Sequence, residues 1–350
     1  MKKKILITWG LGYIGSHAVV AFEQAGYQTV ILDNLSNSCV TTLRNIQSIL
    51  GYKPEYFECD LRDRKSVFEI FETHDFDWVL HFAWAKAVWE SCEQPIYYFQ
   101  NNISGSLFLF EAMEKYSVKN IIFSSSATVY ENTPDISFTS PQPSPLEEKE
   151  HKAGICETDK LGTTNPYGTT KLLLEKILED LSQFSGFNVI NLRYFNPIWA
   201  HPSGKLWEDP DGIPNNLLPF IMKVANGELS KLNVFGDDYD TIDGTWVRDY
   251  IDVNDLVEGH LLAYKKLEEK GSHFCDVFNL WVGKWKSVLE MLEASRKITG
   301  QEILHKISSR REGDVAEVFC NPSKAREELW FLAKVSLEES LENSWKFYKK

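Results

Sequence analysis

Short apolar runs alternate with longer amphipathic stretches along the first half of the chain. Brief β-branched runs predict strands, and apolar residues recurring every three or four positions predict helices. The predicted strands cover 5–8, 29–33, 55–59, 78–82, 120–125 and 188–194, and the predicted helices cover 14–25, 40–50, 63–73, 95–116 and 167–184. This alternation predicts an α/β fold, with a doubly wound parallel sheet covered by helices on both faces.

The pattern becomes irregular after Asn196, which suggests a division into two parts. Residues 1–196 are predicted to form a Rossmann nucleotide-binding domain, interrupted by an exposed, Pro- and Ser-rich insertion at about 135–155. Residues 197–350 are predicted to form a smaller α/β substrate lobe, some segments of which pack back on the first domain. In this lobe we expect helices at 215–226, 253–269, 286–299 and 337–348, and strands near 232–235, 247–251, 276–280 and 303–307.

A glycine-rich turn follows the first predicted strand, where residues 3–16 read KKILITWGLGYIGS. Gly12 would let the backbone approach a pyrophosphate, and Gly15 would let the helix pack close to the strand. The N-terminus of that helix offers N–H groups to the phosphates. Asp33, at the end of the second strand, would accept hydrogen bonds from ribose hydroxyls and repel a 2′-phosphate, which favours NAD over NADP. Trp9 occupies the place of the first glycine of such turns.

Polar residues also follow the next two strands. Asp60 comes after the third strand, where the adenine of a dinucleotide would lie, although a surface aspartate would look the same. Phe82 and Ala83 come after the fourth strand, and Lys86 is close enough to reach a pyrophosphate or a ribose hydroxyl.

Tyr167 and Lys171 form the strongest candidate for catalysis. Their spacing places both side chains on one face of a helix. A nearby cation favours the phenolate of a tyrosine, whose ordinary pKa of ~10 makes it a poor base. Ser126, at the end of the fifth strand, would hold a hydroxyl that is being oxidised and relay its proton. A Tyr–Lys pair alone is weak evidence, and it gains weight from the glycine turn and Asp33.

Composition narrows the class of protein. Apolar residues make up 43% of the 350 residues, charged residues 25%, and the net charge is −13. An acidic surface argues against nucleic acid or an anionic membrane as a partner. No apolar run of 18 residues is present, so no membrane-spanning helix is predicted. The lysines at the start are interpreted as residues that precede a buried first strand rather than as part of a signal peptide. The six cysteines show no metal-binding spacing and suggest reduced thiols in the cytoplasm.

Ten sequence blocks occur in the order typical of one family. They are GYIGSH, LDNLSNS, HFAxxKAV, FSSSATVY, NPYGxxK, LRYFNP, AHPSG, EDPxGIPNNL, FGxDYxTxDGTxVRDYI and REGD. The chain thereby resembles the UDP-galactose 4-epimerases of the extended short-chain dehydrogenase/reductases. The resemblance covers everything except the insertion at about 135–155.

The resemblance implies an isomerase that interconverts UDP-galactose and UDP-glucose in galactose metabolism, with NAD retained and a homodimer as the assembly. Tyr167 would take the proton of the sugar 4-hydroxyl while hydride leaves C4. The 4-keto sugar would then turn over and receive the hydride on its other face. Lys171 would lower the pKa of Tyr167 and hold the nicotinamide ribose, and Ser126 would bind the 4-oxygen.

The same resemblance assigns further residues to the two ligands. The positions implied for NAD are Gly10, Gly12, Tyr13, Ile14, Gly15, Asp33, Asn34, Asn37, Ser38, Asp60, Leu61, Phe82, Ala83, Lys86, Asn101, Ser124, Tyr167, Lys171 and Tyr194. The positions implied for the UDP-hexose are Ser126, Tyr167, Phe195, Asn196, Asn216, Leu217, Phe235, Arg248, Arg311, Asp314 and Val318.

Two positions distinguish close relatives. Ala127 and Thr128 replace the acid–base pair of sugar-nucleotide dehydratases and cannot transfer those protons, which disfavours dehydration. Val318 is small where a bulky side chain would restrict the sugar's 2-substituent, so N-acetylhexosamines are expected to enter. That expectation fails if UDP-N-acetylglucosamine is not turned over where UDP-galactose is.

Nine of the eleven tryptophans stand where the family pattern has glycine. They are Trp9, Trp84, Trp89, Trp199, Trp207, Trp246, Trp281, Trp285 and Trp330. Glycine in such loops supplies positive φ or close backbone approach, and an indole supplies neither. Trp9 is expected to intrude on the pyrophosphate. We hypothesise that a codon meaning glycine has been read as tryptophan. The alternatives are a tryptophan-bearing, non-catalytic nucleotide-binding relative, or another sugar-nucleotide epimerase such as a UDP-glucuronate 4-epimerase.

Overall fold

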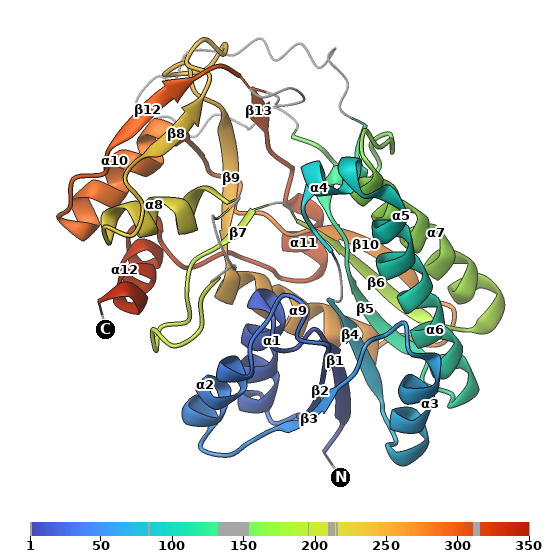
Figure 1. Ribbon diagram of the computed structural model, residues 1–350. Helices are drawn as coiled ribbons and strands as arrows, with labels where there is room; N and C mark the ends of the chain where they lie inside the picture. The colour runs from blue at the N-terminus through green and yellow to red at the C-terminus, as the bar shows by residue number, and fades with distance from the viewer. Residues whose placement is uncertain are drawn as a thin grey trace.

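A seven-stranded parallel sheet forms the centre of the computed structural model (Figure 1). The model describes residues 2–82, 85–131, 154–194, 196–208, 214, 216–310 and 316–349. In spatial order the strands are β10 (Cys275–Asn279), β6 (Asn188–Arg193), β5 (Asn120–Ser124), β4 (Trp78–His81), β1 (Lys4–Thr8), β2 (Gln28–Asp33) and β3 (Glu55–Glu58). The strand order reverses between β1 and β4, and ligands of such sheets bind beyond the carboxyl ends at this point.

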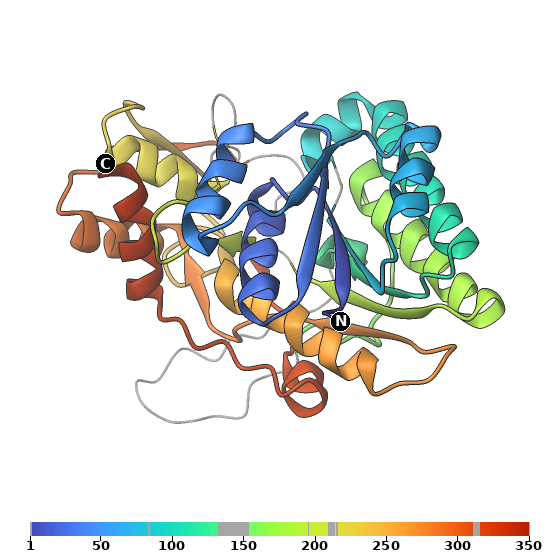
Figure 2. The same cartoon turned by 90° about the horizontal axis from the view of Figure 1, so that it is seen from below.

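Helices cover both faces of the sheet, as Figure 2 shows from below. One face carries α1 (Tyr13–Gln24), α2 (Val40–Leu50) and α9 (Val253–Glu268), and the other carries α3 (Arg64–Thr73), α6 (Gly105–Lys115) and α7 (Pro166–Ser185). The central strands β1 and β4 are therefore apolar on both sides, which explains their continuous hydrophobic runs. The predicted Rossmann fold is confirmed.

The predicted helix at 95–116 is divided in three. It consists of α5 (Pro95–Tyr98), the π-helical turn η1 (Phe99–Ser104) and α6, and it is preceded by the short α4 (Val88–Glu93). A π-helical turn widens the helix by one residue per turn and is frequent at functional sites. Here it contains Asn101 and Asn102, which lie near the nucleotide edge described below.

The smaller lobe packs a second core around short strands. Its helices are α8 (Leu217–Ala225), α10 (Val288–Thr299) and α12 (Leu337–Tyr348), and its strands are β7 (Asn196–Ile198), β8 (Leu232–Phe235), β9 (Val247–Asp252), β11 (Trp285–Ser287), β12 (His305–Ser308) and β13 (Glu317–Val318). Strands β8 and β12 pair with one another, whereas β9 pairs with β7, β11 and β13.

Two segments beyond residue 196 belong to the large sheet and its core. β10 pairs with β6 at the sheet edge, and Leu256 and Val257 of α9 share a hydrophobic core with Ile7 of β1. The two lobes are thus interleaved in sequence. The expected excursion at about 135–155 falls mostly outside the described residues. No described helix has both the length and the apolar character that a bilayer-spanning helix needs.

Six non-glycine residues of the described chain have positive φ, and three of them are tryptophans: Trp9 (+50°), Trp199 (+84°) and Trp330 (+61°). A side chain in this left-handed region costs about 1–3 kcal/mol, whereas glycine adopts it freely. Half of the strained positions are therefore occupied by a residue type that accounts for eleven of 350 residues.

Trp330 stands where other helices of this chain have glycine. Helix α7 ends at Gly186 (φ +72°), after which the amide of Phe187 donates to the carbonyl of Leu181. The short α11 (Ser323–Glu328) ends in the same way, with Trp330 in the left-handed position and the Phe331 amide donating to Ala325. Left-handed glycine is the usual residue at this position.

We expect Trp330→Gly to raise the free energy of unfolding by about 1 kcal/mol, because the indole is 84% exposed and its removal sacrifices little packing. Trp330→Ala is the control, since alanine keeps the cost of positive φ. Chemical denaturation measures both variants. Equal stabilities of the Gly and Ala variants would show that the backbone at this position is not strained.

Candidate functional site

The glycine turn brings strand β1 and helix α1 into close contact. Gly12 is the N-cap of α1, in an extended conformation and without a side-chain cap, so the first helical amides lack a side-chain partner there. A Cβ on Gly15 would lie 2.1 Å from the carbonyl oxygen of Trp9 and 2.9 Å from the Cα of Gly10. Only glycine fits at position 15. This uncapped helix end is the kind of structure that binds a pyrophosphate.

The carboxylate of Asp33 is buried at the end of β2. It accepts hydrogen bonds from the amides of Leu11 (3.0 Å) and Leu35 (2.9 Å) and from the hydroxyl of Ser38 (2.6 Å). Burial raises the pKa of Asp33, and these donors oppose the shift. The donors hold the carboxylate beside the glycine turn, where the ribose of a dinucleotide would meet it.

A small pocket beyond β3 contains the residues expected to contact adenosine. Asn34 Nδ2 donates to Asp60 Oδ2 (3.0 Å), and Arg62 binds the same carboxylate, which lowers the pKa of Asp60 to about 2. Leu61 and Asn101 also line the pocket. The free volume is about 10 Å³, room for no more than one water molecule.

Trp9 lines this pocket. It packs partly buried against both cores of the large lobe and shares the pocket with Asn34, Asp60 and Leu61. Its φ is +50°. The described residues fit a dinucleotide at Gly12, Gly15 and Asp33, and the expectation that the indole intrudes on the pyrophosphate stays a prediction.

Tyr167 and Lys171 face the end of β5. The Ser126 side chain lies close enough to the Tyr167 hydroxyl to lower its pKa, and Lys171 Nζ donates to the carbonyl of Ser124 (2.5 Å). Asn165 caps α7 by accepting from the amide of Gly168 (2.8 Å), which fixes the first helical turn. Helix α7 therefore places the phenol and the ammonium at adjacent points of one strand end.

Burial dominates the pKa of Tyr167 in this structure, and the expected effect of Lys171 on it stays a prediction. Burial raises the pKa of Tyr167 to about 12, and only the hydrogen bond with Ser126 opposes this shift. Burial also lowers the pKa of Lys171 well below its usual range, while Glu175 opposes the shift. The ammonium lies 5.7 Å from the centre of the Tyr167 ring, with its nearest acceptor on Ser124. Desolvation therefore disfavours the charged form of both groups.

The ends of β4 and β6 complete this edge. The hydroxyls of Ser124 and Tyr194 are hydrogen-bonded, and Phe82 and Tyr194 both contact the ring of His260. His81 is fully buried and bonds Thr8 and Ser106 (2.8 and 2.9 Å). This histidine joins β4 to β1 and α6 and does not face the site.

Residues expected to bind the UDP-sugar lie on the second lobe. Asn196 of β7 donates to the carbonyl of Asp249 (3.3 Å). Arg248 and Val318 are register partners on β9 and β13, and the Arg248 guanidinium stacks 4.8 Å from the Trp246 ring. Leu217 begins α8 and Phe235 ends β8.

Two polar contacts join the lobes across this edge. Glu208 is buried and accepts from both Lys86 Nζ and Asn216 Nδ2, each at 2.7 Å. The hydroxyl of Tyr13, beside the glycine turn, donates to the carbonyl of Trp199 (2.6 Å). The candidate NAD and UDP-sugar residues are thus brought to facing sides of one interface.

Comparison with known proteins identifies the family. Residues 5–280 match the model of the NAD dependent epimerase/dehydratase family. The chain is 48% identical to the UDP-glucose 4-epimerase of Bacillus subtilis over 98% of its own length and 96% of the relative's. The chain belongs to this epimerase family.

Solved members of the epimerase family share the whole fold. The UDP-glucose 4-epimerase of Stenotrophomonas maltophila, solved with bound NAD and formylated UDP-arabinopyranose, is 40% identical, with a TM-score of 0.90 and coverage of 99% and 98% of the two chains. The Bifidobacterium longum enzyme, in complex with NAD+ and UDP, is also 40% identical, with a TM-score of 0.87 over the same shares.

The structure of this epimerase-family chain brings most of the predicted residues to one edge of the sheet. The remaining NAD candidates there are Gly10 in the turn, Ile14 at the start of α1 and Asn37 in the exposed loop after β2. Ala83, Phe195, Arg311 and Asp314, together with Trp84, lie outside the described residues. Their predicted roles stay predictions.

Two residues that position the site were missed from the sequence. Asn102 is fully buried in η1, where its Oδ1 accepts from the amide of Ala85 (3.0 Å) and its Nδ2 donates to the Ala85 carbonyl and to Thr170 Oγ1. It thereby fixes the loop after β4 against α7. Glu208 is the other. Asn102 has no sequence signal, because Ala85 and Thr170 come from other elements, and Glu208 begins the block EDPxGIPNNL without having been assigned a role from it.

We expect Asn102→Ala to lower the free energy of unfolding by about 2–3 kcal/mol, because the buried backbone groups of Ala85 lose their partners. The control is Asn101→Ala at the neighbouring, less buried position, where the expected loss is under about 1 kcal/mol. Urea denaturation compares the two. Equal losses would contradict the bridging role of Asn102.

Proposed function

We propose that this chain is an NAD-dependent UDP-glucose 4-epimerase that interconverts UDP-galactose and UDP-glucose by oxidation and reduction at sugar C4. The observation that carries the proposal is the juxtaposition of Tyr167 with Ser126 and of Lys171 with Ser124 at the edge that holds the glycine turn and Asp33. The UDP-glucose 4-epimerases named above support it.

In this proposal Ser126 holds the 4-hydroxyl of the sugar, and Tyr167 accepts its proton directly or through the serine. Bound NAD supplies the acceptor, and then the donor, of the C4 hydride. Because burial raises the pKa of Tyr167 to about 12, the phenolate needs positive charge beside it, which the Lys171 ammonium supplies when protonated. When C4 is reduced again, the Tyr167 hydroxyl returns its proton to the 4-oxygen and becomes the phenolate once more.

Substrate choice rests on the second lobe. Arg248 offers a forked pair of hydrogen-bond donors to a pyrophosphate. Val318 is its register partner on β13, and the small valine side chain leaves room for a substituent at C2 of the sugar. We therefore include UDP-N-acetylhexosamines among the substrates. A UDP-glucuronate 4-epimerase is the second candidate, and product analysis with several UDP-sugars distinguishes the two.

The proposed activity belongs to a chain with glycine at the nine tryptophan positions. Three observations support this step. Trp9, Trp199 and Trp330 have positive φ, Trp9 narrows the adenosine pocket, and the buried Nε1 of Trp199 has no hydrogen-bond partner among the described residues. Other members of the set are accommodated, such as Trp207, whose Nε1 donates to the hydroxyl of Tyr348 (3.2 Å). If one glycine codon has been read as tryptophan, tryptophan appears both at positions that strain the backbone and at positions that accommodate the indole.

The test compares the chain as written with a Trp9→Gly, Trp84→Gly version in the conversion of UDP-galactose to UDP-glucose. We expect the glycine version to be active and the chain as written to be at least about tenfold less active, because the indole of Trp9 stands in the adenosine pocket. Trp330→Gly alone, at an exposed position just after α11 and outside the pocket that Trp9 lines, is the control and should not change activity.

Activity of the glycine version that is lost on Tyr167→Phe, with bound NAD retained, supports the catalytic assignment. Inactivity of both chain versions would remove the epimerase proposal. Equal activity of the two chain versions would support the epimerase proposal and would show that Trp9 does not inhibit the enzyme.

The proposal includes a homodimer, supported by apolar side chains that face outward on neighbouring helices. Ile96 of α5, Leu107 of α6 and Leu173 of α7 are 68%, 43% and 45% exposed. These helices lie side by side in Figure 1. We also place the enzyme in the cytoplasm, with support from its six free cysteines.

We expect Leu107→Glu with Leu173→Glu to weaken dimerisation by roughly a hundredfold, because carboxylates would be desolvated in an apolar interface. Leu332→Glu is the matched control, since Leu332 is 56% exposed and follows α11 rather than lying on α5, α6 or α7. Light scattering across a dilution series reads the dimer fraction. A monomeric parent, or equal dissociation of the control, would contradict this interface.

A further inference from the structure

A buried ion pair lies behind the serine-rich end of β5. Glu175 and Arg193 are 6% and 3% exposed. Arg193 binds the carboxylate with two nitrogens, Nε to Oε1 (2.9 Å) and Nη2 to Oε2 (2.6 Å). Burying two charges costs desolvation that their attraction often fails to exceed, so stability alone is a weak reason for this pair.

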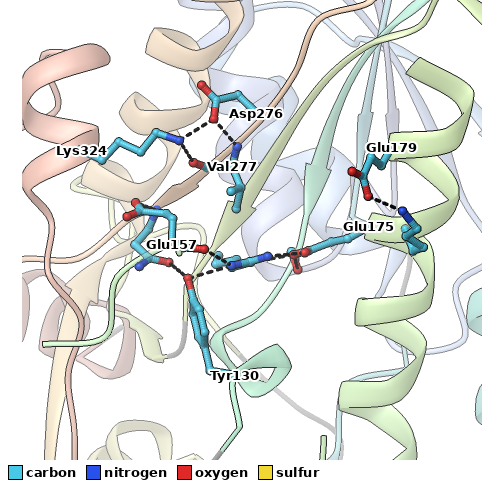
Figure 3. A network of polar contacts seen from close by, with 11 residues as sticks. Tyr130, Glu157, Glu175, Glu179, Asp276, Val277 and Lys324 are labelled. Carbon is cyan, nitrogen blue, oxygen red and sulfur yellow. Dashed lines mark hydrogen bonds and ion pairs between the residues drawn. The ribbon is translucent and has the colours of Figure 1, made fainter. Parts of the chain in front are cut away.

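The guanidinium of Arg193 is also fixed from its other side. Its Nη1 donates to the hydroxyl of Tyr130 (2.9 Å), and that hydroxyl donates to Asn279 Oδ1 (2.7 Å). The amide of Asn279 in turn donates to Glu157 Oε1 (2.7 Å). Figure 3 shows Glu175 and Tyr130 on opposite sides of this network. A guanidinium held in this way fixes the orientation of the carboxylate that it binds.

Glu175 contacts the strand end through Ser125, whose Oγ donates to Oε1. Ser125 stands between Ser124, whose carbonyl accepts from Lys171, and Ser126, whose side chain lies beside Tyr167. The side chain of Ser125 itself is bonded to the ion pair.

Helix α7 carries the three side chains that meet this serine-rich strand end. Tyr167, Lys171 and Glu175 follow one another at intervals of four residues, so they lie along one face of α7. Lys171 bonds the carbonyl of Ser124, Glu175 bonds the hydroxyl of Ser125, and Tyr167 lies beside Ser126, so α7 meets the end of β5 at three successive turns. Tyr167 and Lys171 are the groups proposed for catalysis, whereas Glu175 is assigned no ligand contact.

We propose that Glu175, held by Arg193, is a positioning residue for the epimerisation. It fixes Ser125, and through the backbone of Ser125 it sets the Ser124 carbonyl for Lys171 and the Ser126 hydroxyl for Tyr167. The claim rests on the proposed function, and it concerns the geometry of the catalytic groups rather than the binding of either nucleotide.

Ser125→Ala is the sharpest test, because it removes the contact between the pair and the strand while leaving Glu175 and Arg193 bound to each other. Glu175→Gln would instead leave a buried, unpaired guanidinium and endanger folding. The control is Ser295→Ala, which removes a fully buried hydroxyl from α10 in the other lobe. Ser125→Thr keeps the hydroxyl and serves as the rescue.

In the active version of the chain we expect Ser125→Ala to lower kcat roughly tenfold, with the KM for UDP-galactose and the bound NAD unchanged within about twofold. Ser125→Thr should restore most of kcat, and Ser295→Ala should leave it unchanged. A parental kcat in Ser125→Ala, an equal rise in KM, or failure of the rescue would overturn the proposal.

Hydrogen exchange gives a reading that does not depend on activity. Peptides covering 124–129 should exchange faster in Ser125→Ala than in the parent and in Ser295→Ala, because the strand end loses its third contact. If every version is inactive but exchange rises as expected, the proposed function fails and the positioning contact stands. Unchanged exchange would overturn the positioning role whatever the activity.

Discussion

The close approach of strand β1 and helix α1 at the glycine turn is the constraint on which the rest of the site depends. A Cβ on Gly15 would stand 2.1 Å from the carbonyl oxygen of residue 9, so strand and helix touch backbone to backbone. That contact sets the N-terminus of α1 beside the buried carboxylate of Asp33. Tyr13, the first residue of α1, donates a hydrogen bond from its hydroxyl to the second lobe. A dinucleotide bound there would lie along the carboxyl edge toward β5. The backbone of residue 9 is therefore part of this close approach between strand and helix.

Burial governs the chemistry at the other end of this edge. Lys171 is buried and Tyr167 is half-buried, and desolvation disfavours the charged form of each. Such groups are useful only if their partners are placed within narrow limits, because a buried charge without an oriented partner is costly. The three serines at the end of β5 provide these partners, and the Glu175–Arg193 pair holds the middle serine. The end of β5 thus carries both the partners of the proposed catalytic groups and the contact that holds those partners in place.

The sequence predicted what is local and missed what is assembled from distant segments. Strand ends such as Asp33 and Ser124, and the helix face shared by Tyr167 and Lys171, follow from short-range periodicity, and the structure has them as expected. β10 was placed in the second lobe because its pairing with β6 joins segments far apart in the chain. Glu175 has no sequence signal, since Arg193 and Ser125 become its neighbours only on folding. The burial that raises the pKa of Tyr167 cannot be read from spacing either.

The central claim is that this fold belongs to an epimerase whose nucleotide turn carries glycine at position 9, although the sequence as written has tryptophan. Peptide mass spectrometry on the protein isolated from its natural source tests it most directly. Our account predicts the mass of glycine at positions 9 and 246. The mass of tryptophan at both positions would contradict it and would leave a tryptophan-bearing member of the family with a narrowed nucleotide site.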